Sequence, residues 1–236
     1  MQIAIFLYDH MTALDAVGPY EVLSRLTGAE TVFVAERPGP VRCDTRHLAL
    51  VADAALADVQ RPDVVLVPGW SGARQDALLT AGPVHDWLRD VDAHTTWTTS
   101  VCTGSLILAA AGLLAGRRAT THWLAREELA RLGAEATDER VVFAGKYVSA
   151  AGVSAGIDMA LELVARIDGS ATAQAIQLGI EYDPQPPFDA GCAAKAPAEL
   201  VEAMTAIRNY ILYGAPAQTD GRSGVDGQRL WVEDGS

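Results

Sequence analysis

Short apolar runs alternate with longer stretches of helical periodicity along most of the chain. The apolar runs lie between turn residues and are typical of strands buried on both faces; they occupy residues 2–8, 31–35, 63–68 and 97–101. Apolar residues at helical spacing predict helices over residues 14–26, 73–79, 84–91, 123–132 and 154–167, and a further one after Cys102. This alternation predicts an α/β fold, a mostly parallel sheet with helices on both faces, which binds ligands at the carboxyl ends of its strands.

The remaining elements are shorter or less regular. A small hairpin is expected at residues 41–44 and 47–51, and strands at 119–121, 140–143 and 147–150. Helices are expected at residues 171–181 and 197–213, with an irregular loop of proline and glycine residues at 183–196. From residue 214 the composition is polar and rich in glycine, so we expect one α/β domain over 1–213 and a mobile tail over 214–236.

The stretch over residues 97–114 holds the strongest candidate for chemistry. It reads WTTSVCTGSLILAAAGLL and places Cys102 between a strand and an apolar helix. A thiol at such a junction resembles a nucleophile elbow, whose sharp turn requires small neighbours such as Ser100 and Gly104. The helix N-terminus that follows is expected to lower the pKa of the thiol. The alternative is that Cys102 is a buried small hydrophobic residue.

Charge and cysteine spacing exclude several classes of function. The formal net charge of −12 argues against a nucleic-acid partner, which needs a basic surface. Cys43, Cys102 and Cys192 are widely spaced and form no metal-binding pattern with the histidines, so we expect no metal and no cofactor. The apolar run at residues 3–8 is too short for a signal peptide, and no stretch is long enough to span a membrane. These features predict a reduced, cytoplasmic protein.

Four segments resemble the DJ-1/PfpI superfamily and, within it, the isonitrile hydratase branch. They are LDAVGPYEVL (14–23), DVVLVPGW (63–70), TTSVCTGSLILAAAGLLAGRRATTHW (98–123) and GVSAGIDMALELV (152–164). The resemblance covers residues 2–192. It implies a flavodoxin-like fold, a cysteine nucleophile at the elbow, a small-molecule substrate and, in most members, a homodimer.

The resemblance also implies roles for single residues. It makes Cys102 the nucleophile and Asp15 its acidic partner, although an aspartate near a helix start is also a common N-terminal cap. Thr103 occupies the place where protease-like and amidotransferase-like relatives have histidine. Without that imidazole, amide hydrolysis lacks its base. Thr103 is expected either to offer its hydroxyl to the substrate or Asp15, or to make only a local hydrogen bond.

Four further residues are candidates for binding substrate or a developing anion. Gly69 resembles the glycine whose following N–H groups, with those after Cys102, form an anion-stabilising pocket. Gly104 is expected to supply one of the N–H groups that follow Cys102. Trp70 stands where the family often has another glycine and is expected to supply an apolar wall. His122 is titratable, but a lone histidine beside Trp123 at a helix start is more often structural.

The leading hypothesis is an enzyme that adds water to an isonitrile through a covalent cysteine thioimidate and yields an N-substituted formamide. The main alternative is a ligand-sensing domain like those of AraC-type transcription regulators, which carry two helix-turn-helix units after it. Here only residues 197–236 follow, and they contain few basic side chains. A redox or glyoxalase protein like DJ-1 is a third alternative, and it would use the same cysteine.

Overall fold

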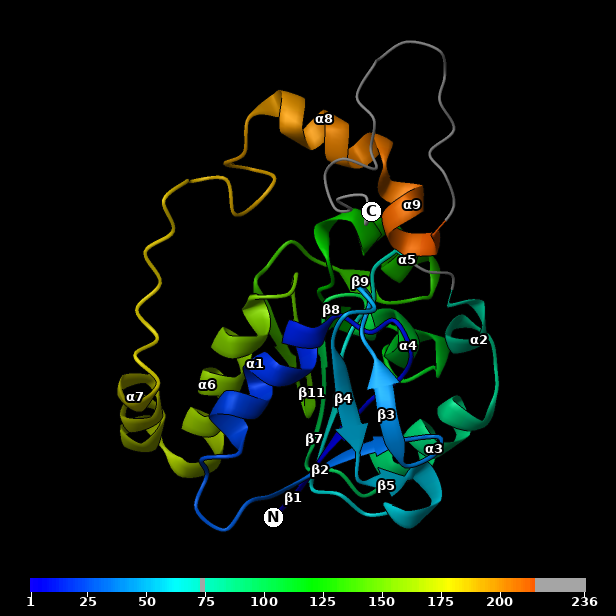
Figure 1. Cartoon of the computed structure of the whole chain (residues 1–236), viewed down its shortest axis with the longest axis vertical. Helices are drawn as coiled ribbons and strands as arrows, with labels where there is room; N and C mark the ends of the chain where they lie inside the picture. Colours follow the sequence, from blue (N-terminus) through cyan, green and yellow to red (C-terminus); the bar gives the residue numbers. More distant parts are fainter. Residues whose placement is uncertain (73–74, 215–236) are drawn as a thin grey trace.

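A twisted sheet forms the centre of the computed structural model, which describes residues 1–72 and 75–214 (Figure 1). In that part of the chain the sheet has seven strands in the order β10-β11-β7-β6-β1-β2-β5, parallel except for β10. Its strands are β1 (Gln2–Phe6), β2 (Glu30–Ala35), β5 (Ala54–Ala55), β6 (Val64–Val67), β7 (Trp97–Val101), β10 (Val141–Ala144) and β11 (Tyr147–Ala150). This order is that of the flavodoxin-like fold, as the resemblance implied.

Helices cover both faces of the sheet, as predicted. On one face α6 packs against α1 and β11, and on the other α4 packs against β6, β7 and α3 (Figure 1). The helices are α1 (Ala13–Leu23), α2 (Asp76–Leu79), α3 (Pro83–Asp92), α4 (Gly104–Ala110), α5 (Arg126–Arg131), α6 (Ala155–Asp168), α7 (Ser170–Gly179), α8 (Ala198–Ala206) and α9 (Arg208–Tyr213), with short 3-10 turns η1 (Leu56–Asp58) and η2 (Trp123–Ala125). The central strands β1 and β6 are buried apart from the partly exposed Gln2, which explains their continuous apolar runs.

Within the described residues, two small two-stranded ladders lie outside this sheet. The predicted hairpin is β3 (Gly39–Arg42) with β4 (Ala49–Ala52), and the second ladder pairs β8 (Arg118–Ala119) with β9 (Glu135–Ala136). The two-residue strands β5 and β9 were not predicted, because two residues carry no periodicity.

The C-terminal part differs from the prediction. The single helix expected over residues 197–213 is wrong, since α8 and α9 are separate helices that break at Ile207. Trp70 Nε1 donates to Leu212 O at 2.9 Å, and Gly72 N donates to Ile211 O at 2.7 Å, so α9 is tied to the loop after β6. The predicted tail, apart from residue 214, lies outside the described residues.

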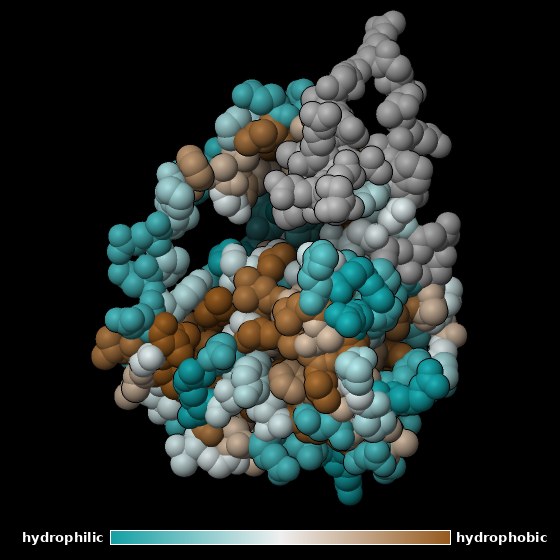
Figure 2. Space-filling model, viewed as in Figure 1, coloured by the Kyte–Doolittle hydropathy of each residue, from teal (hydrophilic) through white to brown (hydrophobic). Residues whose placement is uncertain are grey.

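An extended segment connects α7 to α8 and runs apart from the sheet (Figure 1). Most of its hydrogen bonds in the described structure join residues close in sequence, but the Tyr182 hydroxyl donates to Asp158 Oδ1 on α6 at 2.7 Å. Phe188 on this segment and Leu178 on α7 are 78% and 79% exposed. Apolar side chains also gather on the face of the molecule below the segment (Figure 2).

Candidate active site

Three connections meet at the carboxyl edge of the sheet and bring the predicted residues together. They follow β1, β6 and β7. Gly69 and Cys102 lie in the second and third connections, and Asp15 lies in the first turn of α1, just after the first. The chain passes from β1 outward to β2 and then returns to β6 on the other side of β1. Such a reversal of strand order is where open α/β sheets bind their ligands.

Cys102 adopts the backbone conformation of a nucleophile elbow. Its φ is 58°, in the left-handed region, which costs a residue with a side chain of the order of 1–3 kcal/mol. The surrounding chain holds this conformation. Cys102 N donates to Ala150 O and Ala151 O, and the hydroxyls of Ser105 and Thr121 donate to Cys102 O at 3.2 and 2.9 Å. The side chain is presented at the end of β7 but is only 4% exposed.

Gly104 makes the elbow sterically possible. A Cβ at this position would lie 2.1 Å from Val67 O and 2.8 Å from Pro68 O, so the first turn of α4 packs directly on the end of β6. The need for a small residue two positions after Cys102 is therefore confirmed. The second small neighbour, Ser100, is fully buried within β7.

Asp15 is fully buried beside the cysteine. The N-terminal cap of α1 is Thr12, so the capping alternative for Asp15 is wrong. Gly69 N donates to Asp15 Oδ2 at 2.9 Å, while Oδ1 is buried without a hydrogen bond of ordinary geometry to any described residue. Burial raises the pKa of Asp15 to about 7, against the lowering effects of the Gly69 N–H and the neighbouring Cys102 thiol.

The expected lowering of the thiol pKa is wrong. Burial, followed by the Asp15 carboxylate, raises the pKa of Cys102 well above its ordinary value. The N–H groups of Val153 and Thr103 and the Thr103 hydroxyl lower it, but by less. A helix N-terminus lowers a thiol pKa when the thiol is accessible, whereas this thiol faces a buried acid.

Thr103 and Trp70 hold each other through two hydrogen bonds. Trp70 N donates to Thr103 Oγ1 at 2.7 Å, and Thr103 Oγ1 lies 3.1 Å from Trp70 O. The N–H groups of Gly69 and Trp70 thus already have protein acceptors, so neither is free for a substrate anion. The indole of Trp70 is 1% exposed and points toward α9.

His122 has the contacts of a structural residue. It is the N-terminal cap of η2, and its Nδ1 accepts a hydrogen bond from Leu124 N at 3.4 Å. Burial lowers its pKa to about 4, so the imidazole is neutral at pH 7. Its predicted role in substrate binding gains no support from these contacts.

Sequence reasoning missed three residues that lie near Cys102 and Asp15. The buried Tyr8 lies two residues after the end of β1, and Asp44 raises the pKa of both Tyr8 and Asp15. Val153, with φ of 28°, places its N–H on the Cys102 sulfur. The position of Tyr8 at the carboxyl end of the first strand was the available signal.

No group of three or more His, Cys, Asp or Glu side chains within the described ranges could hold a metal ion. In the same ranges no helix has the length and apolar character needed to cross a bilayer.

The sequence model of the DJ-1/PfpI family matches residues 1–166. The chain belongs to the DJ-1/PfpI family. Among its members, the isonitrile hydratase of Pseudomonas putida is 41% identical over 202 residues, which are 86% of this chain and 87% of that protein. The crystal structure of a THiJ/PfpI family protein from Pseudomonas syringae is 40% identical, covers 86% of this chain and 84% of its own, and has a TM-score of 0.83.

A regulator shares part of the same domain. The HTH-type transcriptional regulator CdhR of Pseudomonas aeruginosa is 34% identical over 135 residues, which are 56% of this chain and 38% of the regulator. Within the DJ-1/PfpI family, a hydratase therefore matches this chain over nearly its whole length and a regulator over a part of it.

Proposed function

We propose that this DJ-1/PfpI protein is an isonitrile hydratase, an enzyme that converts an isonitrile and water to an N-substituted formamide. The observation that carries the proposal is the pairing of a thiol at a nucleophile elbow with a buried carboxyl group whose pKa is raised to about 7. The similarity to the Pseudomonas putida hydratase, which extends over most of both chains, supports it.

In the first proposed step, Cys102 adds to the terminal carbon of the isonitrile. Asp15 accepts the thiol proton as the sulfur attacks, and then passes it to the same carbon. One C–S bond and one C–H bond form, and the product is a thioimidate, R–N=CH–S–Cys102. Asp15 returns to the carboxylate form.

In the second step, water releases the product. The water oxygen adds to the thioimidate carbon while Asp15 takes a proton from the water. Asp15 then delivers this proton to the thioimidate nitrogen. The adduct then collapses with loss of the C–S bond, and its hydroxyl proton returns to the Cys102 sulfur. The product is R–NH–CHO, and both side chains regain their initial protonation states.

The raised pKa of Asp15 suits both steps. A group that accepts and donates a proton in one cycle works best when its pKa lies near the working pH. The thiol does not need to be ionised in advance, because the carboxylate beside it removes the proton during attack. Cys102 is accordingly the proposed nucleophile, and Asp15 the proposed acid and base.

The neighbouring residues support this pair in different ways. Thr103 is proposed to contact the sulfur through its hydroxyl, and no imidazole occupies its position to serve as the base for amide hydrolysis. Gly69 and Trp70 orient Asp15 and Thr103 through their N–H groups. Gly104 allows the elbow to close, and His122 caps η2.

We further propose that the protein is a cytoplasmic homodimer with no metal, cofactor, membrane or nucleic-acid partner. None of the three cysteines is in a disulfide, which suits a reducing compartment. A second copy would cover Leu178 and Phe188, which project from α7 and the extended segment. Sedimentation equilibrium at twice the 24.9 kDa chain mass would support the dimer, and the monomer mass would refute it.

Formamide production from one alkyl and one aryl isonitrile tests the function. The wild type and Cys192→Ala, whose cysteine is exposed on the segment between α7 and α8, are expected to produce formamide at equal rates. Cys102→Ala is expected to fall to the uncatalysed rate with an unchanged melting temperature. If the folded wild type binds isonitrile without turnover, the sensing function is favoured. If Cys102→Ala retains its rate, the covalent mechanism is wrong.

A further inference from the structure

One peptide group joins Tyr8 to Asp15. Tyr8 donates from its hydroxyl to Pro68 O at 2.7 Å, and Gly69 N donates to Asp15 Oδ2 at 2.9 Å. Pro68 O and Gly69 N belong to the same planar unit, and in a trans peptide the C=O and N–H point in opposite directions. The hydroxyl at one end therefore controls the direction of the donor at the other.

The space around this peptide leaves little room for an alternative orientation. A Cβ on Gly69 would lie 2.5 Å from Thr103 N and 2.9 Å from Asp15 Oδ2. Pro68 O faces Gly104, where a Cβ would approach it to 2.8 Å. A tilt that displaces the Gly69 N–H is small in angle, but it changes the hydrogen bond to the carboxylate directly.

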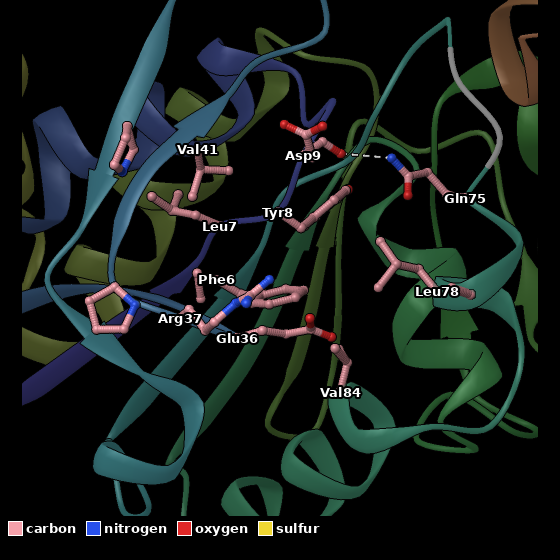
Figure 3. A pocket seen from close by; sticks show the side chains of 14 residues that line it. Phe6, Leu7, Tyr8, Asp9, Glu36, Arg37, Val41, Gln75, Leu78 and Val84 are labelled. Atoms are coloured by element: carbon pink, nitrogen blue, oxygen red, sulfur yellow. Dashed lines mark hydrogen bonds between the residues drawn. The ribbon is translucent and has the colours of Figure 1, made fainter.

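Tyr8 is 8% exposed, and its ring packs in the hydrophobic core. Its centroid lies 5.2 Å from that of Phe6, and its hydroxyl reaches Pro68. A cavity of about 450 Å³ lies alongside, lined by Tyr8, Phe6, Leu78 and Val84 among other residues (Figure 3). Because the ring borders this cavity, the hydrogen bond from its hydroxyl to Pro68 O helps to hold the ring and the peptide in place relative to each other.

We propose that Tyr8 is a positioning residue of the hydratase, whose hydroxyl aims the Gly69 N–H at Asp15 and so sets the pH range in which Asp15 transfers protons. This role rests on the proposed function for its effect on the rate. The effect on Asp15 itself follows from the geometry alone.

The charges around Asp15 make this single donor important. Asp44 raises the pKa of Asp15, whereas the Cys102 thiol lowers it through a hydrogen bond. The Tyr8 phenol stays neutral, since burial raises its pKa well above the ordinary value. No Lys, Arg or His is among the groups that shift the pKa of Asp15, so the Gly69 N–H is its main stabilising partner in the ionised form.

The test is the titration of the Asp15 carboxyl carbon by ¹³C NMR in the wild type and Tyr8→Phe, with the signal assigned by its loss in Asp15→Asn. Loss of the hydroxyl weakens the hydrogen bond to the carboxylate, so the midpoint should move to higher pH by about one unit. The acid limb of kcat/KM for formamide production should move with it. The rate at pH 6 then falls about tenfold, while the rate at pH 9 stays near that of the wild type.

Tyr147→Phe is the matched control, because it removes a hydroxyl that donates at 2.9 Å to a second buried aspartate, Asp92. It is expected to leave the Asp15 titration and the pH profile unchanged. An unchanged Asp15 midpoint in folded Tyr8→Phe, or an equal shift in Tyr147→Phe, would overturn the proposal. If the wild type makes no formamide, the NMR titration still decides the role of Tyr8, so the two failures are distinguishable.

Discussion

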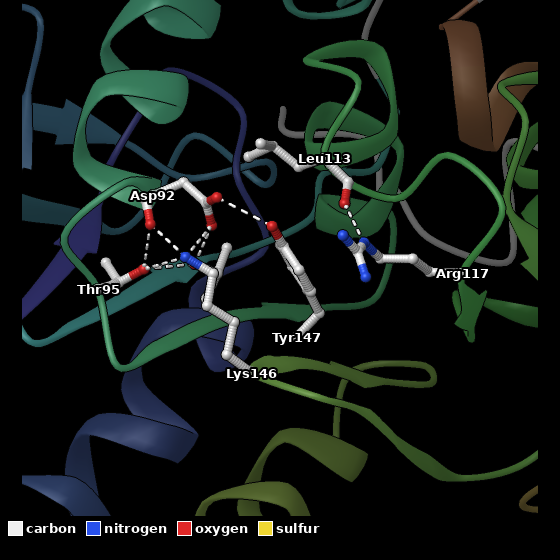
Figure 4. Close-up of polar contacts among 7 residues, drawn as sticks. Asp92, Thr95, Leu113, Arg117, Lys146 and Tyr147 are labelled. Atoms are coloured by element: carbon white, nitrogen blue, oxygen red, sulfur yellow. Dashed lines mark hydrogen bonds and ion pairs between the residues drawn. The ribbon is translucent and has the colours of Figure 1, made fainter.

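Two aspartates are buried in the part of the chain that the structure describes, and their surroundings differ. Asp92, at the end of α3, lies beside Lys146 Nζ at 3.2 Å and accepts hydrogen bonds from Thr98 and Tyr147 at 2.6 and 2.9 Å (Figure 4). Asp15 accepts one backbone N–H. Among the described residues it has no cation beside it, and one of its oxygens has no hydrogen bond of ordinary geometry.

The difference separates a structural carboxylate from one poised for chemistry. A buried charge that has a counter-ion and filled hydrogen bonds holds elements together. A buried carboxyl group with few partners takes up a proton more easily, and its pKa rises toward neutrality. Asp92 links α3 to the strands β7 and β11, whereas Asp15 faces a thiol at the carboxyl edge of the sheet.

The largest contrast is expected in turnover. Asp15→Asn keeps the size of the side chain and an acceptor for Gly69 N but removes the proton carrier, so formamide production should fall at least about a hundredfold. Asp92→Asn should stay within about threefold of the wild type, because it alters no group at the elbow. Steady-state rates of the two variants measure this, and equal losses would remove the distinction.

A smaller contrast is expected in stability, where Asp92→Asn rather than Asp15→Asn should show the loss. Asp92→Asn leaves Lys146 without its counter-ion and should lower the free energy of unfolding by about 1–3 kcal/mol at pH 7. The loss stays below that of a fully buried pair, because the Lys146 side chain is 31% exposed. Urea denaturation provides the value, and an unchanged midpoint would mean that the Asp92 cluster contributes no stability.

The smallest effect concerns the stability of Asp15→Asn and its pH dependence. The pKa of Asp15 is about 7 in the folded protein and 3.8 ordinarily, so the folded state holds the extra proton between these values and loses stability as pH rises across them. Asparagine at position 15 does not titrate, so Asp15→Asn should not show this loss of stability with rising pH. The variant should be more stable than the wild type by about 1–2 kcal/mol at pH 8, less than the full shift implies because the amide is buried too. At pH 4 the gain should vanish; a constant difference would contradict the raised pKa.

The sequence allowed most of the fold to be predicted, because continuous apolar runs and helical spacing reflect burial directly. The strands β1, β2, β6 and β7 and the helices α1, α3 and α6 were all found within a few residues of their ends. The break between α8 and α9 was not found, since Ile207 is neither glycine nor proline and gives no local signal.

The candidate site was predictable in its position but not in its electrostatics. Cys102, Asp15 and Gly69 follow three strands of a parallel sheet, and such connections meet at one edge. The raised thiol pKa depends on burial against Asp15, which the local helix start does not reveal. The contribution of Tyr8 depends on the orientation of a single peptide, and no sequence pattern encodes that orientation.

The pH dependence of kcat/KM for formamide production, measured in the wild type and Asp15→Asn, tests the central claim most directly. The working state needs an ionised Asp15 beside a neutral thiol, so the wild-type value should rise with pH through about 7. Asp15→Asn should show a low rate without that limb. A wild-type profile that is flat from pH 5 to 9, or the same limb in Asp15→Asn, would contradict the assignment of Asp15 as the proton carrier.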